Sequence, residues 1–241
     1  MGAHRPRVAA QEPFRLSEAG QRRSDLYGRR LGRPLSSSQQ RLVESLLPKI
    51  GVPVGTIDLP ALFPVARSFA IEVGFGGGEH LAAQAGAHPD VGYIGCEPFL
   101  NGVAKLLTQV DQAKLKNVRV HPDDARDVLP RLPSQSLSAV YVLFPDPWPK
   151  LRHHKRRFIQ KRSLDEIARV LKPGGEVRVA TDHRDYARWA LQHLMADSRF
   201  RWTAACAADW RVRPADWPAT RYEQKALKAG RPCVYLKFLR L

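Results

Sequence analysis

Residues 68–82, SFAIEVGFGGGEHLA, decide the fold because they join an apolar strand-like run to a glycine-rich turn and the start of a helix. Gly74, Gly76 and Gly78 stand at this junction, where glycine permits positive φ and lets a ligand approach the backbone closely. A dinucleotide fingerprint, GxGxxG, would need glycine where Glu79 stands, and a carboxylate at a helix N-terminus would repel a pyrophosphate. The turn therefore disfavours a nicotinamide dehydrogenase, while an ordinary glycine-rich turn stays open as an alternative.

From Ser68 onward, apolar strand-like runs alternate with helical patterns. The strand-like runs are SFAIEV, VGYIGC, VRVH, SAVYVLF and EVRVA, and the helical patterns include HLAAQA, FLNGVAKLLTQV, FIQKRSLDEIARVL and DYARWALQHLM. Alternation of this kind predicts an α/β fold with a mostly parallel, doubly wound sheet covered by helices on both faces. FRWTAAC and PCVYLKFLRL predict two more strands, the last one antiparallel, separated by a polar loop without a helical period.

The first 35 residues differ from the rest of the chain. They contain eight arginines, no lysine and three acids, without a sustained hydrophobic period. QQRLVESLLPKI, which follows, has apolar residues at helical spacing and predicts one short helix that ends near Pro48. We therefore expect a flexible basic arm over residues 1–35 and a single catalytic domain over residues 36–241.

The charge balance indicates the class of partner. In 241 residues, 39 Lys and Arg against 23 Asp and Glu give a formal charge of +16, which suits a polyanion, nucleic acid first and an anionic membrane second. The sequence lacks an apolar run of about 18 residues and the apolar core of a signal peptide, so we expect a soluble, cytoplasmic protein. Three cysteines without CxxC spacing argue against a disulfide framework or a cysteine-rich zinc site.

Acidic residues stand at the ends of three successive predicted strands. Glu72 lies at the end of SFAIEV, Glu97 follows VGYIGC where adenosine ligands place their ribose, and Asp124 follows VRVH at the expected level of an adenine amino group. A carboxylate at position 97 can accept both ribose hydroxyls. The alternative for each acid is a helix cap or first-turn residue, most of all for Asp124 before ARDVL.

The fourth predicted strand runs into PDPWPKLRHHKRRF. Its prolines stop the strand and stiffen the loop, which places Asp146 and Trp148 at the carboxyl edge of the sheet. A basic stripe follows directly, with no acid in it: Lys150, Arg152, Lys155, Arg156 and Arg157. Because this stripe adjoins the sheet edge where a cofactor is expected, it predicts a surface that binds phosphates. A solvent-exposed helix face is the alternative. Trp148 could stack on a base, although packing is the more common fate of tryptophan.

Taken together, IEVGFGGGEHL, GCEPFLNGV, DDARDVL, LFPDPWPKLRHHKRR, LKPGGEVRVATDH and TRYEQK resemble the bacterial tRNA (guanine-N7-)-methyltransferase family, which acts on guanine 46 of the variable loop. The resemblance covers residues 22–241, and FPDPW with RHHKRR is its specific part. It implies a Rossmann-like class I methyltransferase fold, S-adenosyl-L-methionine as cofactor and tRNA as partner. Two departures concern the site: GGGEH stands where many relatives have a bulkier residue followed by Ser or Thr, and Pro149 stands where His is common.

The resemblance also implies roles for individual residues. The acids of the cofactor site would be Glu72, Glu97, Asp124 and Asp146, with Asp146 as the catalytic residue. The glycine-rich turn adds Gly74, Gly76 and Gly78 to the expected cofactor site. By the same resemblance, the target nucleotide would be held by Lys150, Asp182, Thr220, Arg221, Tyr222 and Glu223. The basic stripe adds Arg152, Lys155, Arg156 and Arg157 to the expected substrate site as phosphate contacts. We expect no metal ion and no required protein partner, and a monomer with a homodimer as the alternative.

Guanine N7 carries an exposed lone pair, so it can attack a sulfonium methyl directly and no cysteine nucleophile is needed. Cys233 is therefore expected to be a core strand residue, far from the ends of the fourth and fifth strands. A carboxylate against the guanine N1 and N2 hydrogens would stabilise the developing charge. We expect Asp146 to have this role and Asp182 to orient the base.

The alternative functions are an adenine-N6 methyltransferase, whose loop would read [DN]PP[YFW], and a non-catalytic RNA-binding protein. Adjacent His153 and His154 do not form a metal pair because they point about 100° apart on a helix.

Overall fold

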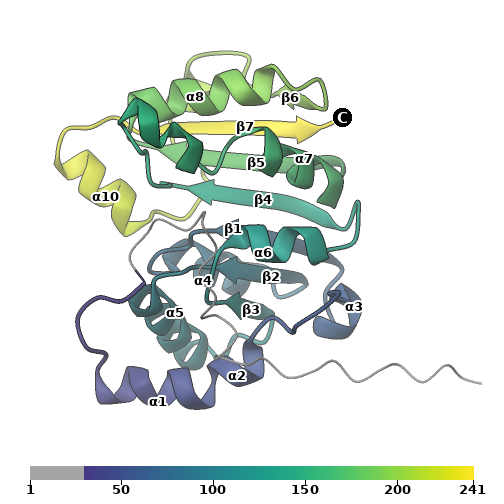
Figure 1. The fold of residues 1–241 in the computed structure, drawn as a ribbon, viewed down its shortest axis with the longest axis vertical. Coiled ribbons are helices and arrows are strands. Elements are labelled where there is room, and N and C mark those ends of the chain that lie inside the picture. Colours follow the sequence, from purple (N-terminus) through teal and green to yellow (C-terminus); the bar gives the residue numbers. More distant parts are fainter. Residues whose placement is uncertain (1–29) are drawn as a thin grey trace, which may run out of the picture.

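The computed structural model describes residues 30–241, which form a seven-stranded sheet in the order β3-β2-β1-β4-β5-β7-β6 (Figure 1). The strands are β1 (Ser68–Val73), β2 (Val91–Cys96), β3 (Val118–His121), β4 (Leu137–Leu143), β5 (Leu171–Thr181), β6 (Phe200–Trp202) and β7 (Val234–Arg240). Strands β1 to β5 pair in parallel, and β7 pairs antiparallel with both β5 and β6. The predicted mostly parallel sheet with an antiparallel last strand is confirmed.

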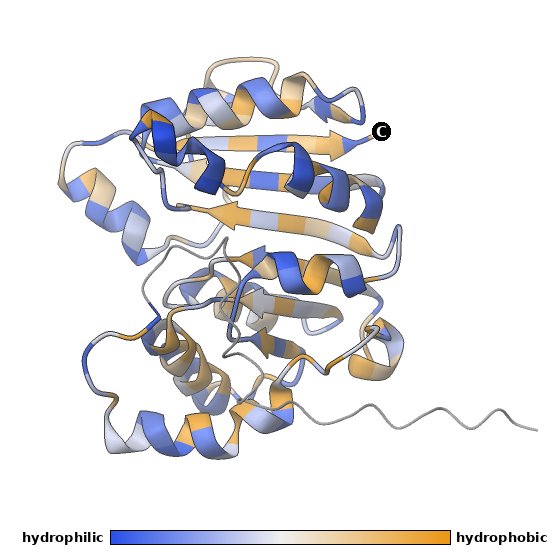
Figure 2. Ribbon diagram, viewed as in Figure 1, coloured by the Kyte–Doolittle hydropathy of each residue, from blue (hydrophilic) through white to orange (hydrophobic). Residues whose placement is uncertain are grey.

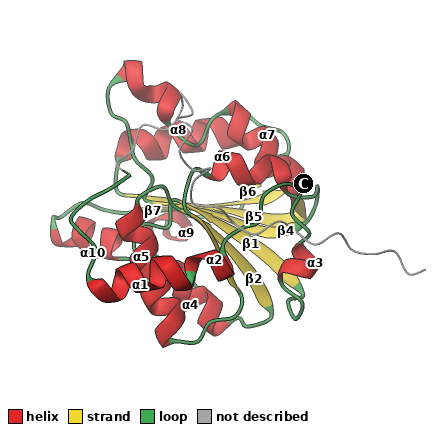
Figure 3. Ribbon diagram, turned by 60° about the horizontal axis from the view of Figure 1, so that its bottom comes forward, coloured by secondary structure: helices red, strands yellow, loops and turns green. Residues whose placement is uncertain are grey.

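Helices cover both faces of this sheet (Figure 3). They are α1 (Ser37–Ser45), α2 (Leu47–Ile50), α3 (Leu59–Leu62), α4 (Glu79–Ala87), α5 (Leu100–Gln112), α6 (Ala125–Val128), α7 (Lys161–Val170), α8 (Arg184–Met195), α9 (Ala208–Arg211) and α10 (Arg221–Lys228), with short 3₁₀ helices η2 (Leu129–Arg131) and η3 (Leu151–Arg156). In Figure 3, α6, α7 and α8 lie on one face, and α1, α4 and α5 lie on the other. No helix within residues 30–241 is long and apolar enough to cross a membrane.

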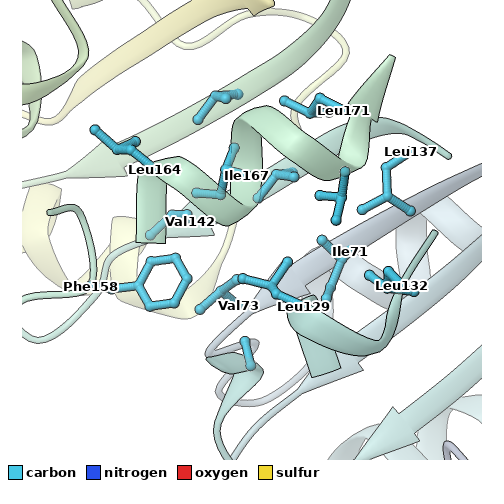
Figure 4. Close-up of a cluster of buried hydrophobic side chains, with 14 of the residues drawn as sticks. Ile71, Val73, Leu129, Leu132, Leu137, Val142, Phe158, Leu164, Ile167 and Leu171 are labelled. Atoms are coloured by element: carbon cyan, nitrogen blue, oxygen red, sulfur yellow. The ribbon is translucent and has the colours of Figure 1, made fainter. Parts of the chain in front are cut away.

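The core follows from the apolar pattern of the strands and helices. Figure 2 shows apolar residues along the strands and alternating apolar and hydrophilic residues along the covering helices. On the face of α7, Leu164 and Ile167 pack with Ile71 and Val142 of the central strands (Figure 4). Burying one such side chain contributes about 1.5 to 3 kcal/mol, so this layer holds β1 and β4 side by side under the site described below.

Two details differ from the sequence prediction. The loop between the last two strands contains α9 and α10, where no helix was expected. Strand β5 begins at Leu171, five residues before the expected run at Glu176. Residues 30–33 contact the start of α5, because Leu100 N donates to Arg30 O at 2.9 Å and Asn101 Nδ2 donates to Arg33 O at 2.7 Å. The division into a basic arm over residues 1–35 and a domain over residues 36–241 stays a prediction, and residues 1–29 of that arm lie outside the described residues.

Candidate active site

The site lies where the strand order reverses. Strand β1 has β2 on one side and β4 on the other, so the loops after β1 and β4 diverge and leave a crevice at the carboxyl edge. Two adjoining cavities open there, of about 540 Å³ and 140 Å³, and share Gly74, Pro98, Pro145 and Asp146 in their walls. The loops after β1, β2, β3 and β4, together with α10, therefore surround one connected hollow.

The glycine loop adopts the conformation that its sequence predicts. Gly74, Gly76 and Gly78 have φ values of 68°, 58° and 79°, a region that side-chain-bearing residues rarely occupy. Gly74 and Gly76 line the cavities, and a Cβ on Gly76 would stand 2.7 Å from the Tyr222 ring. Gly78 caps α4 and faces Leu106 of α5, so it lines neither cavity. Gly78 thus lets α4 and α5 pack closely, and its predicted contact with the cofactor stays a prediction.

Glu97 is buried and faces the larger cavity. Its carboxylate accepts hydrogen bonds from Gly76 N at 2.7 Å and Phe99 N at 2.9 Å, which ties the end of β2 to the glycine loop. Burial raises the pKa of Glu97 to about 7, and these two amides partly oppose the rise. A carboxylate oxygen has two lone pairs, so both oxygens keep acceptor capacity toward a ligand in the cavity.

Glu72 lies behind the cavity wall. The side chain is buried, and its Oε2 lies 2.7 Å from Nδ1 of the buried His80 on α4, whose ring packs edge-on against Tyr141. Val73 and Gly74 line the smaller cavity, whereas Glu72 lines neither. The structure thus assigns Glu72 a partner in His80, a residue of the GGGEH run.

The end of β3 carries two carboxylates. Asp124 caps α6 by accepting from Arg126 N at 2.9 Å, and it pairs with the Arg126 guanidinium at 2.8 Å. Asp124 is therefore a helix cap, the alternative role considered for it, and it also lines the smaller cavity. Asp123 lines the same cavity and pairs with Arg30. Sequence reasoning missed Asp123, although its place beside Asp124 in HPDDA was the available signal.

Asp146 stands on a strained loop at the mouth of both cavities. Its neighbours Phe144 and Trp148 have φ values of 49° and 42°, each of which costs a residue with a side chain about 1 to 3 kcal/mol. Partial desolvation raises the pKa of Asp146 above the usual carboxyl value. Trp148 lines the smaller cavity, and the Arg156 guanidinium lies 4.9 Å from its ring centre. This geometry holds one carboxylate at the point where the two hollows meet.

The basic stripe forms the 3₁₀ helix η3 and its flanks. Lys150, Arg152 and Lys155 are exposed, and Arg156 is half-buried against Trp148. Arg157 is completely buried and pairs with Asp185 at the start of α8. The prediction that Arg157 contacts phosphate is therefore wrong, because its side chain turns inward at the end of η3.

Two of the remaining predicted substrate residues, Arg221 and Tyr222, belong to α10, which lies beside the carboxyl end of β4 (Figure 1). Tyr222 is exposed and lines the larger cavity, and Arg221 packs against its ring at 5.0 Å while its Nε lies 3.6 Å from Glu79. Asp182, directly after β5, pairs with Arg231 at 2.7 Å.

Thr220 and Glu223 belong to the scaffold. Thr220 is buried and caps α10 by accepting from Glu223 N at 3.1 Å. Glu223 is buried too; it accepts from the Tyr235 hydroxyl and lies 3.1 Å from Arg213 Nε. Neither residue lines either of the two cavities, and the contacts of both side chains hold α10 and Tyr222 in place. Their contact with the target nucleotide stays a prediction.

Cys233 is buried, as expected of a core residue, but its expected place was wrong. Because β7 runs antiparallel, Val234 pairs with Thr181, so Cys233 lies near the end of β5.

His153 packs edge-on against Trp148, and His154 packs against Trp189 and lies 3.8 Å from Asp185. Within residues 30–241, no cluster of three or more histidine, cysteine or carboxylate side chains could hold a metal ion.

Comparison with known proteins adds family evidence to this geometry. A family model described as putative methyltransferase matches residues 66–236. The tRNA (guanine-N(7)-)-methyltransferase of Rhodospirillum rubrum is 52% identical over 221 residues, covering 89% of this chain and 87% of that protein. The enzyme of the same name from Azorhizobium caulinodans is 48% identical over 228 residues, covering 94% of this chain and 99% of that protein.

A solved structure supports the fold alone. The 16S rRNA methyltransferase KamB superimposes with a TM-score of 0.58 at 15% identity, covering 78% of this chain and 96% of that one. The close relatives, by contrast, share about half of their residues with this chain over nearly its full length. On this evidence the chain belongs to the tRNA (guanine-N(7)-)-methyltransferase family.

Proposed function

We propose that the protein transfers a methyl group from S-adenosyl-L-methionine to N7 of guanine 46 in the variable loop of tRNA, with Asp146 as the catalytic residue. As a member of its family, the protein is an S-adenosyl-L-methionine-dependent tRNA guanine-N7 methyltransferase. The observation that carries the proposal is the position of Asp146, between the glycine loop and the exposed basic residues of η3.

The residues around the hollow fit this cofactor. A phosphate-bearing ligand would meet Glu79 in the first turn of α4 and the carboxylates of Glu97, Asp124 and Asp146. S-adenosyl-L-methionine carries no phosphate and a positive sulfonium, so this acidic set suits it. Gly74 and Gly76 leave the loop without side chains where the ligand would lie against it. When bound, the cofactor supplies an electrophilic methyl group.

We assign each cofactor-facing residue one task. Glu97 accepts the ribose hydroxyls, Asp124 lies at the adenine end, and Glu72 contributes negative charge behind Gly74 for the methionine ammonium, with one oxygen bound to His80. Phe144, Pro145 and Tyr222 form the wall that excludes water from the larger cavity. Fixed positioning of this kind supplies much of the rate, because it replaces a bimolecular encounter.

Asp146 acts on the guanine. Its carboxylate accepts from the N1 and N2 hydrogens and stabilises the positive charge that N7 methylation leaves on the purine. Asp182, fixed by Arg231, orients the base from the end of β5. Trp148 offers a stacking surface at the smaller cavity, and Arg221 and Tyr222 close the opposite side of the hollow. We propose that the enzyme works as a monomer in the cytoplasm, where its tRNA substrate is.

The exposed basic residues of η3 should contact tRNA phosphates. Replacing Lys150, Arg152 and Lys155 together with Gln should flatten the slope of log affinity against log salt by about two units, because each phosphate contact contributes about 0.7 to 0.9. The matched control replaces three exposed lysines at the opposite edge of the sheet, Lys114, Lys116 and Lys172, and should keep the parent slope. Equal slopes in both triple variants would remove η3 from the RNA surface.

Cofactor affinity should depend on pH through Glu97. Its pKa is raised to about 7, and ribose hydroxyls favour the ionised carboxylate, so affinity should rise as the pH increases through 7 and then level off. In Glu97→Gln this pH dependence should vanish and the dissociation constant should rise about tenfold or more. Calorimetry from about pH 6 to 8 measures both effects. The exposed Glu44→Gln variant is the control, and a parent affinity that does not vary with pH would contradict the assignment.

The position of the target base is tested with unmodified tRNA transcripts. A transcript with guanine at position 46 should accept one methyl group per molecule, and the same transcript with adenine at that position should accept none. Methylation of both transcripts would place the target guanine elsewhere in the tRNA and refute the assignment of position 46.

A further inference from the structure

The buried arginine at the end of η3 has a role other than RNA contact. Arg157 is completely buried, and its Nε donates to Pro147 O at 2.9 Å while its Nη2 lies 3.4 Å from Trp148 O. The same Nη2 donates to the carboxylate of Asp185 in the first turn of α8. One guanidinium therefore joins the two residues that follow Asp146 to the helix that follows Asp182.

The loop that carries Asp146 needs such an outside partner. Pro145, Pro147 and Pro149 have no N–H group, so the loop offers few amides to satisfy its own carbonyls. Trp148 is also held at a φ of 42°, which persists only where the surroundings determine it. The Arg157 hydrogen bonds fall on the carbonyl of Trp148 itself and on that of the residue before it.

The surroundings of Arg157 make its position rigid. Its guanidinium lies 4.9 Å from the ring centre of Trp189 and 5.7 Å from that of Tyr186, both on α8. A buried charge needs hydrogen-bonding partners, and Nε and Nη2 of Arg157 have two carbonyls and one carboxylate, whereas the buried Nη1 has none among the described residues. Lysine could not make these contacts together, because an ammonium lacks the planar fork of a guanidinium.

We propose that Arg157 is the positioning residue that sets Asp146 relative to Asp182, so that both carboxylates meet the guanine in one geometry. The proposal rests on the function proposed above for Asp146. It predicts a loss of turnover without a loss of RNA affinity, which is opposite to the effect expected for the exposed residues of η3.

Arg169 provides a matched control on the same chain. Its guanidinium also donates to two carbonyls, Leu129 O and Leu132 O, and pairs with the carboxylate of Glu166. It lies near the end of α7, directly before β5, at the edge of the sheet opposite the site. Arg157→Lys and Arg169→Lys therefore remove comparable hydrogen bonds at two different places.

The test compares kcat, the KM for tRNA and hydrogen exchange over residues 143–150. Arg157→Lys should lower kcat by up to about 100-fold with an unchanged KM and should speed exchange in this loop. Arg169→Lys should lower thermal stability and leave kcat and the exchange of this loop at parent values. Parent-like kcat in Arg157→Lys, or equal loop exchange in both variants, would overturn the proposal.

Two further variants keep the test decisive. In Arg157→Gln the salt slope of tRNA binding should match the parent, and a slope smaller by about 0.7 to 0.9 would return Arg157 to phosphate contact and overturn the proposal. If Arg157→Lys does not fold, Asp185→Asn removes the carboxylate partner from a half-exposed position and should also speed loop exchange; parent-like exchange there would overturn the proposal. If the parent makes no 7-methylguanosine, the proposed function fails, and the loop-exchange comparison still decides whether Arg157 fixes the loop.

Discussion

Replacing Asp146 with Asn should lower kcat by about 100- to 1000-fold while the dissociation constant of the cofactor changes little. The substitution keeps the size of the side chain and removes its charge. In the proposed site the carboxylate accepts from N1 and N2 of guanine, and this interaction strengthens as positive charge develops on the purine. An interaction that strengthens in the transition state affects turnover more than binding, so the KM for tRNA should also stay close to the parent value.

The measurement is single-turnover methyl transfer at saturating tRNA, with cofactor affinity by calorimetry. Asp90→Asn is the matched control, because Asp90 is exposed in the loop before β2, at the opposite edge of the sheet. This control should react at the parent rate. Parent-like turnover in Asp146→Asn would show that the carboxylate at the cavity mouth takes no part in the reaction.

Replacing Gly102 with Ala should abolish measurable cofactor binding and destabilise the protein by about 3 kcal/mol. Gly102 lies in the first turns of α5, and a Cβ there would overlap the carbonyl oxygen of Gly76 and stand 3.2 Å from Glu97 Cγ. The overlapping atom belongs to the backbone, so the glycine loop must move as a whole. Its movement would break the 2.7 Å hydrogen bond from Gly76 N to Glu97 and displace both residues from the cavity wall.

Gly86→Ala is the control for this substitution. Gly86 lies in α4, where a Cβ would meet only Leu115 at 3.9 Å, so Ala should stabilise the helix by about 0.5 to 1 kcal/mol and leave cofactor binding intact. Chemical denaturation and calorimetry on both variants separate the two outcomes. Normal cofactor affinity in Gly102→Ala would contradict the close packing of α5 on the glycine loop.

The sheet and the position of the site could be predicted from the sequence because both follow from local patterns. Apolar runs separated by helical periods specify a parallel sheet, and the loops after its strands must meet at one edge. Glu97 and Asp146 could be located in this way. The direction of each side chain within a run of like charges could not be predicted. Nothing in RHHKRR distinguishes Lys155, which is exposed, from Arg157, which is buried against Asp185 and α8.

Helix α10 was missed for a different reason. Its buried residues are Glu223 and Ala226, so it has no apolar stripe from which a helical period could be recognised. Its inner face is held by the hydrogen bond from Tyr235, a residue of the next strand. The available signal was the capping pattern Thr220-Arg221-Tyr222-Glu223, in which a threonine precedes a glutamate by three positions.

Nucleoside analysis tests the central claim most directly. The purified protein is incubated with methyl-labelled S-adenosyl-L-methionine and tRNA from cells that lack 7-methylguanosine, and the tRNA is digested and separated into nucleosides. We expect the label to elute as 7-methylguanosine with the parent protein and with Asp90→Asn, and to be lost with Asp146→Asn. Label in any other nucleoside, or in none with the parent protein, would contradict it.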